Sequence, residues 1–75
     1  MMVGKIIAIF DISIEVVLQK NEIKVGDILG TEDNSNYRFE VVEISNTTAI
    51  CISLDSTRGL KKGTSVKLLS HGINI

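Results

Sequence analysis

The chain has 75 residues, of which 44% are hydrophobic and 4% aromatic, with no proline and no tryptophan. This length allows a single small domain, and the composition predicts an aliphatic core. A net charge of −1 argues against general nucleic-acid binding, which needs a basic surface. The single cysteine excludes an internal disulfide and a multi-cysteine zinc site, and it fits a reducing cytoplasm.

Short β-strands are the predicted elements, because the chain is rich in β-branched isoleucine, valine and threonine. The predicted strands cover, in chain order, residues 3–10, 12–18, 27–31, 37–44, 48–54 and 64–69, with a possible last strand over 73–75. In the second strand an apolar residue recurs at every other position, which predicts one inward-facing set. That set is Ile12, Ile14, Val16 and Leu18. Residues 19–24 are expected to form a polar connection.

Two turns and one irregularity are also predicted. Residues 32–36 read Glu-Asp-Asn-Ser-Asn, which favours a hairpin turn, and Ser45-Asn46 predicts another turn. After Val41 the apolar alternation shifts by one position, which indicates a β-bulge or burial on both faces. Short strands at regular spacing predict a small closed barrel, since closure removes exposed edge strands, with a sandwich as the alternative.

No group of side chains predicts catalysis. Residues 59–64, Gly-Leu-Lys-Lys-Gly-Thr, have three residues between the glycines, whereas a phosphate-binding loop needs four and then lysine. Cys51 is expected to be a packed thiol and His71 an exposed side chain, so a small enzyme acting through either is the weakest hypothesis. Tyr37 and Phe39 share one predicted strand face. They are expected in the core, and a stacking platform for single-stranded nucleic acid is the alternative.

Several segments, in order and spacing, resemble one protein family. Gly4-Lys5-Ile6 followed by Ile14-Glu15-Val16 is similar to the opening of the catalytic β subunit of F-type rotary ATP synthases. The best match covers residues 54–63, Leu-Asp-Ser-Thr-Arg-Gly-Leu-Lys-Lys-Gly, which resemble Asp-Ser-Thr-Asp-Gly-Leu-x-Arg-Gly of that subunit. Asp11 departs from the pattern, since the family usually has glycine there. Residues 25–29 are closer to noncatalytic, vacuolar-type, flagellar and type III export relatives.

The resemblance implies an all-β fold, a closed six-stranded Greek-key barrel without significant helix, with residues 1–75 as a single N-terminal domain. In that family such barrels form a crown that holds the hexameric ring together during ATP synthesis or hydrolysis coupled to ion transport. The family binds ATP, ADP and Mg in a nucleotide-binding domain that lies downstream. The resemblance therefore implies no catalytic, cofactor-binding or metal-binding residue in this chain. We expect the chain alone not to be an enzyme, and to be an excised domain of a cytoplasmic ATPase subunit, peripheral to the membrane.

The partners implied by the resemblance are neighbouring α/β-type barrels in a hexameric ring, with no nucleic acid and no direct membrane contact. The isolated fragment is expected to be monomeric or weakly associating. A ring contact needs two different faces of each barrel, so charged turns are the candidate contacts. The candidate inter-subunit residues are Glu32, Asp33, Asn34, Arg58, Lys61 and Lys62. Two alternatives remain: a vacuolar-type, flagellar or type III export ATPase, and a free-standing barrel that binds RNA or a peptide.

Overall fold

A computed structural model describes residues 2–20, 22–33 and 36–72 of the chain. Within these ranges the secondary structure consists of six strands and no helix. The strands are β1 (Met2–Phe10), β2 (Ser13–Leu18), β3 (Ile28–Thr31), β4 (Arg38–Ser45), β5 (Thr48–Ser53) and β6 (Ser65–Ser70). Each of the six lies within one residue of its predicted bounds, so the strand predictions are confirmed. The possible strand over residues 73–75 lies outside the described residues.

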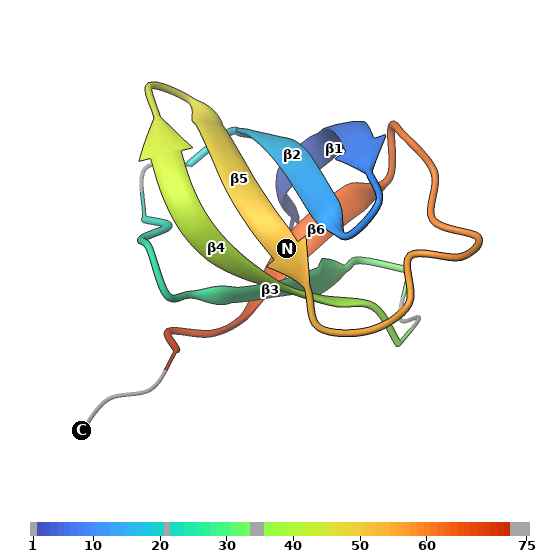
Figure 1. Cartoon of the computed structure of the whole chain (residues 1–75). Helices are drawn as coiled ribbons and strands as arrows, with labels where there is room; N and C mark the ends of the chain where they lie inside the picture. Colours follow the sequence, from blue (N-terminus) through green and yellow to red (C-terminus); the bar gives the residue numbers. More distant parts are fainter. Residues whose placement is uncertain (1, 21, 34–35, 73–75) are drawn as a thin grey trace.

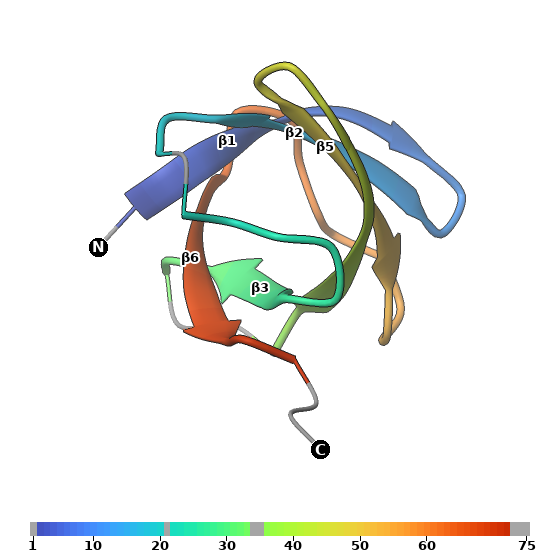
Figure 2. The ribbon, with the colours of Figure 1, turned by 90° about the vertical axis from the view of Figure 1, so that its left-hand side faces the viewer.

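The six strands close into a barrel in the order β1-β2-β5-β4-β3-β6, and all neighbouring pairs are antiparallel (Figures 1 and 2). Strands β3, β4 and β5 follow one another as hairpins, and β6 returns to lie beside β3. This arrangement is a Greek key. Every strand has two hydrogen-bonded neighbours, so the barrel has no free edge that could pair with another chain. The predicted closed barrel is confirmed.

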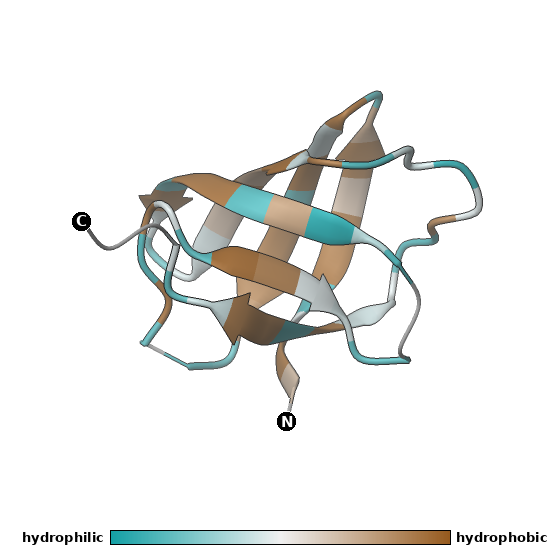
Figure 3. Cartoon of the chain, turned by 90° about the horizontal axis from the view of Figure 1, so that it is seen from below, coloured by the Kyte–Doolittle hydropathy of each residue, from teal (hydrophilic) through white to brown (hydrophobic). Residues whose placement is uncertain are grey.

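The barrel interior is filled by aliphatic side chains and one phenylalanine, as the composition predicts. Phe39 and Val41 of β4 are fully buried, as are Ile14 and Val16 of β2. In β5 the inward residues are the small ones, Ala49, Cys51 and Ser53, so the isoleucines of this strand point outward. Figure 3 shows the result: apolar residues lie along the strands, and hydrophilic residues gather in the connections.

A β-bulge interrupts the pairing of β4 with β5 where the sequence predicted an irregularity. The register shifts between Val41 and Glu43, which leaves Val42 outside the core with 43% of its surface exposed. The predicted turn at Asn46 is also present, and this residue adopts a left-handed backbone with φ of 57°. Asparagine tolerates that conformation better than most side chains. The hairpin turn therefore matches its sequence.

Two details of the second strand and its connection were predicted wrongly. Ile12, expected to face inward, lies in the turn before β2 and is 52% exposed. Ile23, in the connection expected to be polar, is only 5% exposed and belongs to the core. A barrel has open ends that strand side chains do not cover, so a connecting residue fills that space.

Among the described residues, no helix has the length and hydrophobicity needed to cross a bilayer.

Candidate functional site

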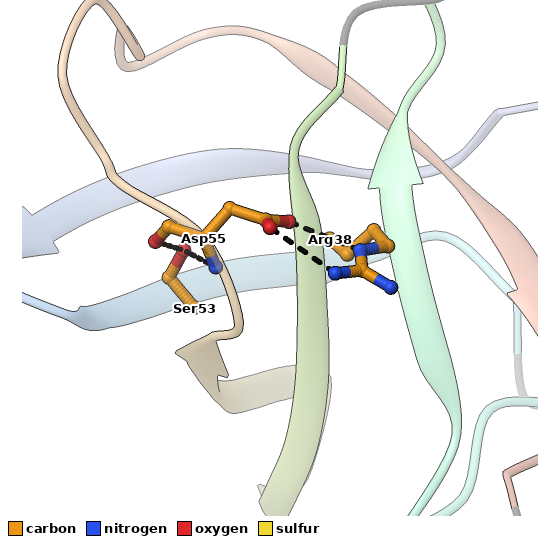
Figure 4. Close-up of polar contacts among 3 residues, drawn as sticks. All are labelled: Arg38, Ser53 and Asp55. Atoms are coloured by element: carbon orange, nitrogen blue, oxygen red, sulfur yellow. Dashed lines mark hydrogen bonds and ion pairs between the residues drawn. The ribbon is translucent and has the colours of Figure 1, made fainter.

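The connection between β5 and β6, residues 54–64, is the segment that best matched a known family and carries three of the candidate contact residues. An ion pair anchors its beginning to β4 (Figure 4). Arg38 donates from Nε to Asp55 Oδ2 and from Nη2 to Asp55 Oδ1, both at 3.1 Å. Ser53 Oγ donates to the carbonyl of Asp55 at 2.6 Å. The two parallel hydrogen bonds between Arg38 and Asp55 fix the direction in which the connection leaves the barrel.

The ion pair also shifts the titration of its two members. The hydrogen bond from Arg38 lowers the pKa of Asp55 below its usual value, and the same contact raises the pKa of Arg38. Both side chains are substantially solvent-exposed, at 56% for Arg38 and 33% for Asp55. The pair therefore serves as a surface clamp, and its arginine is already occupied by its own chain.

Further hydrogen bonds hold the middle and the end of the connection. The Tyr37 hydroxyl donates to the carbonyl of Arg58, and Thr57 Oγ1 donates to the carbonyl of Asp11 in the β1–β2 turn at 3.1 Å. At the far end, Thr64 Oγ1 donates to the Lys61 carbonyl at 2.7 Å. The first two bonds tie the connection to the start of β4 and to the β1–β2 turn, and the third lies within the connection itself. We call the exposed part of this connection, Arg58 to Lys62, the basic loop.

The candidate contact residues lie on the surface in two adjacent places. Arg58, Lys61 and Lys62 are exposed on the basic loop. Glu32 and Asp33 are exposed just after β3, and Asn34 lies outside the described residues. The backbone N–H of Glu32 donates at 2.8 Å to the carbonyl of Ser65, which follows the end of the basic loop by three residues. Both charged segments therefore sit near the start of β6 within one barrel. Their role in contacts between subunits stays a prediction.

The aromatic residues do not form the stacking platform that was the alternative. Phe39 has no exposed surface, and Tyr37 is half-buried with its hydroxyl bound to Arg58. The exposed ring is that of Phe10, at 70%, in the β1–β2 hairpin. Successive bases need accessible ring faces, and a buried phenylalanine offers none.

The two candidate nucleophile or acid–base residues occupy very different environments. Cys51 is fully buried, and this burial raises the pKa of its thiol to about 12, so the reactive thiolate does not form near neutral pH. His71 is exposed, as predicted, and its Nδ1 lies 3.5 Å from Oδ2 of the buried Asp27. Asp27 Oδ2 also accepts a hydrogen bond from the Lys24 backbone N–H at 2.9 Å. In the described ranges, no group of three or more His, Cys, Asp or Glu residues could hold a metal ion.

Sequence reasoning missed the contacts that hold the basic loop in place. The Arg38–Asp55 pair could have been found by folding residues 37–54 about the turn at Asn46, because β4 and β5 then run antiparallel. Phe39 pairs with Ser53 in the structure, which brings Arg38 beside the residues that follow β5. The Tyr37–Arg58 contact joins residues 21 apart through a loop, and sequence spacing gives no signal for it.

Comparison with known proteins identifies the family. Residues 3–69 match the ATP synthase alpha/beta family, beta-barrel domain. The chain belongs to this family. The resemblance predicted from the sequence is thereby confirmed at the level of the alpha/beta family, and the match covers nearly the whole barrel described above.

A solved structure supports the same assignment. The alpha/beta-family barrel is similar to the assembled ATPase EscN from the type III secretion system of enteropathogenic E. coli, with a TM-score of 0.79 and 25% sequence identity. The similarity covers 92% of this chain and 16% of the EscN chain. No curated protein sequence matches this chain.

Proposed function

We propose that this barrel is the N-terminal domain of a ring-forming ATPase subunit and holds neighbouring subunits together. Membership of the ATP synthase alpha/beta family carries this proposal, because the match spans residues 3–69. The barrel is closed, and side-chain hydrogen bonds hold the basic loop at Arg58 and the connection just before it at Thr57, as suits a surface that must keep its shape under load. The proposed role is structural, and the chemistry is left to the nucleotide-binding domain of the complete subunit.

Within this family we propose a β-type subunit of a rotary ATP synthase as the first candidate. The support is the run Leu54-Asp55-Ser56-Thr57 followed by Gly59-Leu60, which resembles that subunit in order and spacing. ATP or ADP with Mg would bind to the downstream domain of such a subunit. The complex would be peripheral to the membrane on its cytoplasmic side, and ion transport would be coupled to catalysis.

A type III export ATPase is the second candidate, and the likeness to EscN favours it. The two candidates differ in how a ring would form. An F-type ring alternates two kinds of subunit, whereas a ring of one kind of subunit closes from a single heterologous interface. Purifying the full-length subunit alone and measuring its mass by sedimentation velocity separates them. A hexamer of this subunit alone supports the export ATPase, and a hexamer that requires a second kind of subunit supports the β-type assignment.

We call the proposed role of the barrel in holding neighbouring subunits together the collar function. It is tested by reversing the charge of the basic loop. In the full-length subunit, Lys61→Glu with Lys62→Glu should lower the fraction assembled into rings, most clearly at low salt, because exposed charges are screened. The matched control is Lys5→Glu with Lys24→Glu, which changes the net charge equally at exposed positions outside the loop. Each exposed contact contributes only about 0–1 kcal/mol, but a hexamer repeats it at every interface. Equal ring fractions for both variants would count against a role for this loop.

Nucleotide binding gives an independent test. The barrel alone should show no heat of ATP binding in calorimetry, since the family places that site in another domain. Micromolar binding of ATP to the 75-residue chain would overturn the proposal.

A further inference from the structure

The outer face of β2, β5 and β4 carries an apolar stripe bordered by carboxylates. The strand registers place Ile50 of β5 between Glu15 of β2 and Glu43 of β4. In the next row, Ile52 lies between Ser13 and Glu40. Because the intervening residues of β5 face the core, the two isoleucines point outward and stay only half-buried. We call the surface formed by Glu15, Glu40, Glu43, Ile50 and Ile52 the acidic face.

Nothing in the described part of the chain covers the acidic face or neutralises it. In Figure 1 no loop passes in front of β4, β5 and β2. Across the described ranges, the carboxylates of Glu15, Glu40 and Glu43 form no hydrogen bond or ion pair, whereas Asp55 is held by Arg38. Adjacent strands lie about 5 Å apart, so Glu15 and Glu43 on either side of β5 are about 10 Å apart, and their like charges repel one another weakly across the stripe. A cationic partner would remove this repulsion.

The chemistry of the acidic face selects the class of its partner. Phosphate groups of a nucleic acid or an anionic lipid would be repelled by three carboxylates. The half-buried isoleucines favour a partner that brings apolar contact in its centre, with lysine or arginine around it. The chain itself displays the cationic part of such a surface, because Arg58, Lys61 and Lys62 of the basic loop are exposed, while its Leu60 packs partly against the barrel core. The basic loop projects to the side of the barrel in Figure 1, away from the acidic face.

We propose that the acidic face receives the basic loop of a second copy of this chain, as the ring of one kind of subunit in the second candidate function would bring together. This inference rests on the proposed collar function and names the surfaces that meet. A ring contact of this kind joins two different surfaces of the subunit. The acidic face and the basic loop lie on different parts of the barrel and carry opposite charges, so they meet this requirement.

Carbodiimide labelling of carboxylates tests the contact in the complete complex. The full-length subunit, free and assembled with its ring partners, is treated with carbodiimide and glycine ethyl ester, and each carboxylate is quantified by mass spectrometry. Labelling of Glu15, Glu40 and Glu43 should fall severalfold on assembly. Amide cross-links from these residues to lysines in the basic loop of an adjacent subunit should also form. The control is Glu22, an exposed carboxylate outside the acidic face, which should label equally in both states.

Charge-reversed variants give a second readout. Glu15→Lys with Glu43→Lys should reduce the ring fraction, Glu43→Gln should reduce it less, and Glu22→Lys should leave it unchanged. If the ring forms while the three carboxylates label as in the free subunit, the proposed contact is wrong and the collar function stands. Cross-links from these carboxylates to a protein segment outside the barrels would also overturn it. If the subunit forms no ring with its partners, the collar function fails, and this contact with it.

Discussion

Replacing Gly4 by alanine tests the closest backbone approach between β1 and β2. A Cβ atom on Gly4 would lie 2.3 Å from the carbonyl oxygen of Val17 and 2.9 Å from Cγ1 of Val16. The nearer atom belongs to the backbone of β2, so the strands would have to separate. Removing a glycine stabilises a compatible site by about 0.4–1 kcal/mol, whereas over-packing costs about 1–3 kcal/mol. We therefore expect the free energy of unfolding to fall by about 1–2 kcal/mol, out of about 4–11 kcal/mol for a domain of this size.

Urea unfolding followed by far-ultraviolet circular dichroism measures this change, because the chain has no tryptophan. Gly30→Ala is the matched control, since Gly30 is also a buried strand glycine. Its added Cβ would meet Leu69 Cδ1 at 2.7 Å, and Leu69 is 46% exposed, so this side chain can rotate into solvent. The nearest backbone atom, the carbonyl oxygen of Tyr37, lies 3.1 Å away, a milder contact than the 2.3 Å at Gly4. Gly4→Ala should therefore destabilise the barrel more than Gly30→Ala. Wild-type stability of Gly4→Ala, or the reverse order of the two variants, would refute this reasoning.

Three further predictions concern the surface clamp, the buried thiol and the basic loop. Because Arg38 lowers the pKa of Asp55, this carboxylate stabilises the fold above about pH 4 and loses that effect as the pH falls through its folded-state pKa. Asp55→Asn should therefore lower the melting temperature at pH 7, with a difference from wild type that shrinks in acid. Cys51, with its pKa raised to about 12, should react with a thiol reagent only at the rate of unfolding, and fast reaction of the folded chain would contradict its burial. Tyr37→Phe removes the hydrogen bond to Arg58 and should cost about 0.5–1.5 kcal/mol, with faster amide exchange in the basic loop; unchanged exchange would show that the loop does not depend on this bond.

Local patterns were sufficient to predict most of the barrel. Side chains of a strand point alternately inward and outward, so the apolar spacing of Phe39 and Val41 predicted that both face the core. The break of this spacing after Val41 predicted the bulge. The turn at Asn46 follows from the conformational range of one side chain. Residues 54–63 pointed to the family because their order and spacing are unusual, and the family match confirmed it. The burial of Ile12 and Ile23 was predicted wrongly. Both residues lie outside the strands, where burial depends on how the closed sheet leaves its ends open and not on strand alternation.

The aliphatic composition and the strand period by themselves predicted one closed β domain, and the order and spacing of residues 54–63 pointed to the ATP synthase alpha/beta family. They could not determine which charges find a partner within the chain. Arg38 and Asp55 pair across the surface, while Glu15 of β2 and Glu40 and Glu43 of β4 flank the two isoleucines of β5 and stay without a partner among the described residues. The pairing of β2 with β5 decides where Glu15 lies, and this pairing joins strands that are far apart in the sequence, so only the folded sheet brings them together. The acidic face is therefore a product of the tertiary structure, although every residue in it was visible in the sequence.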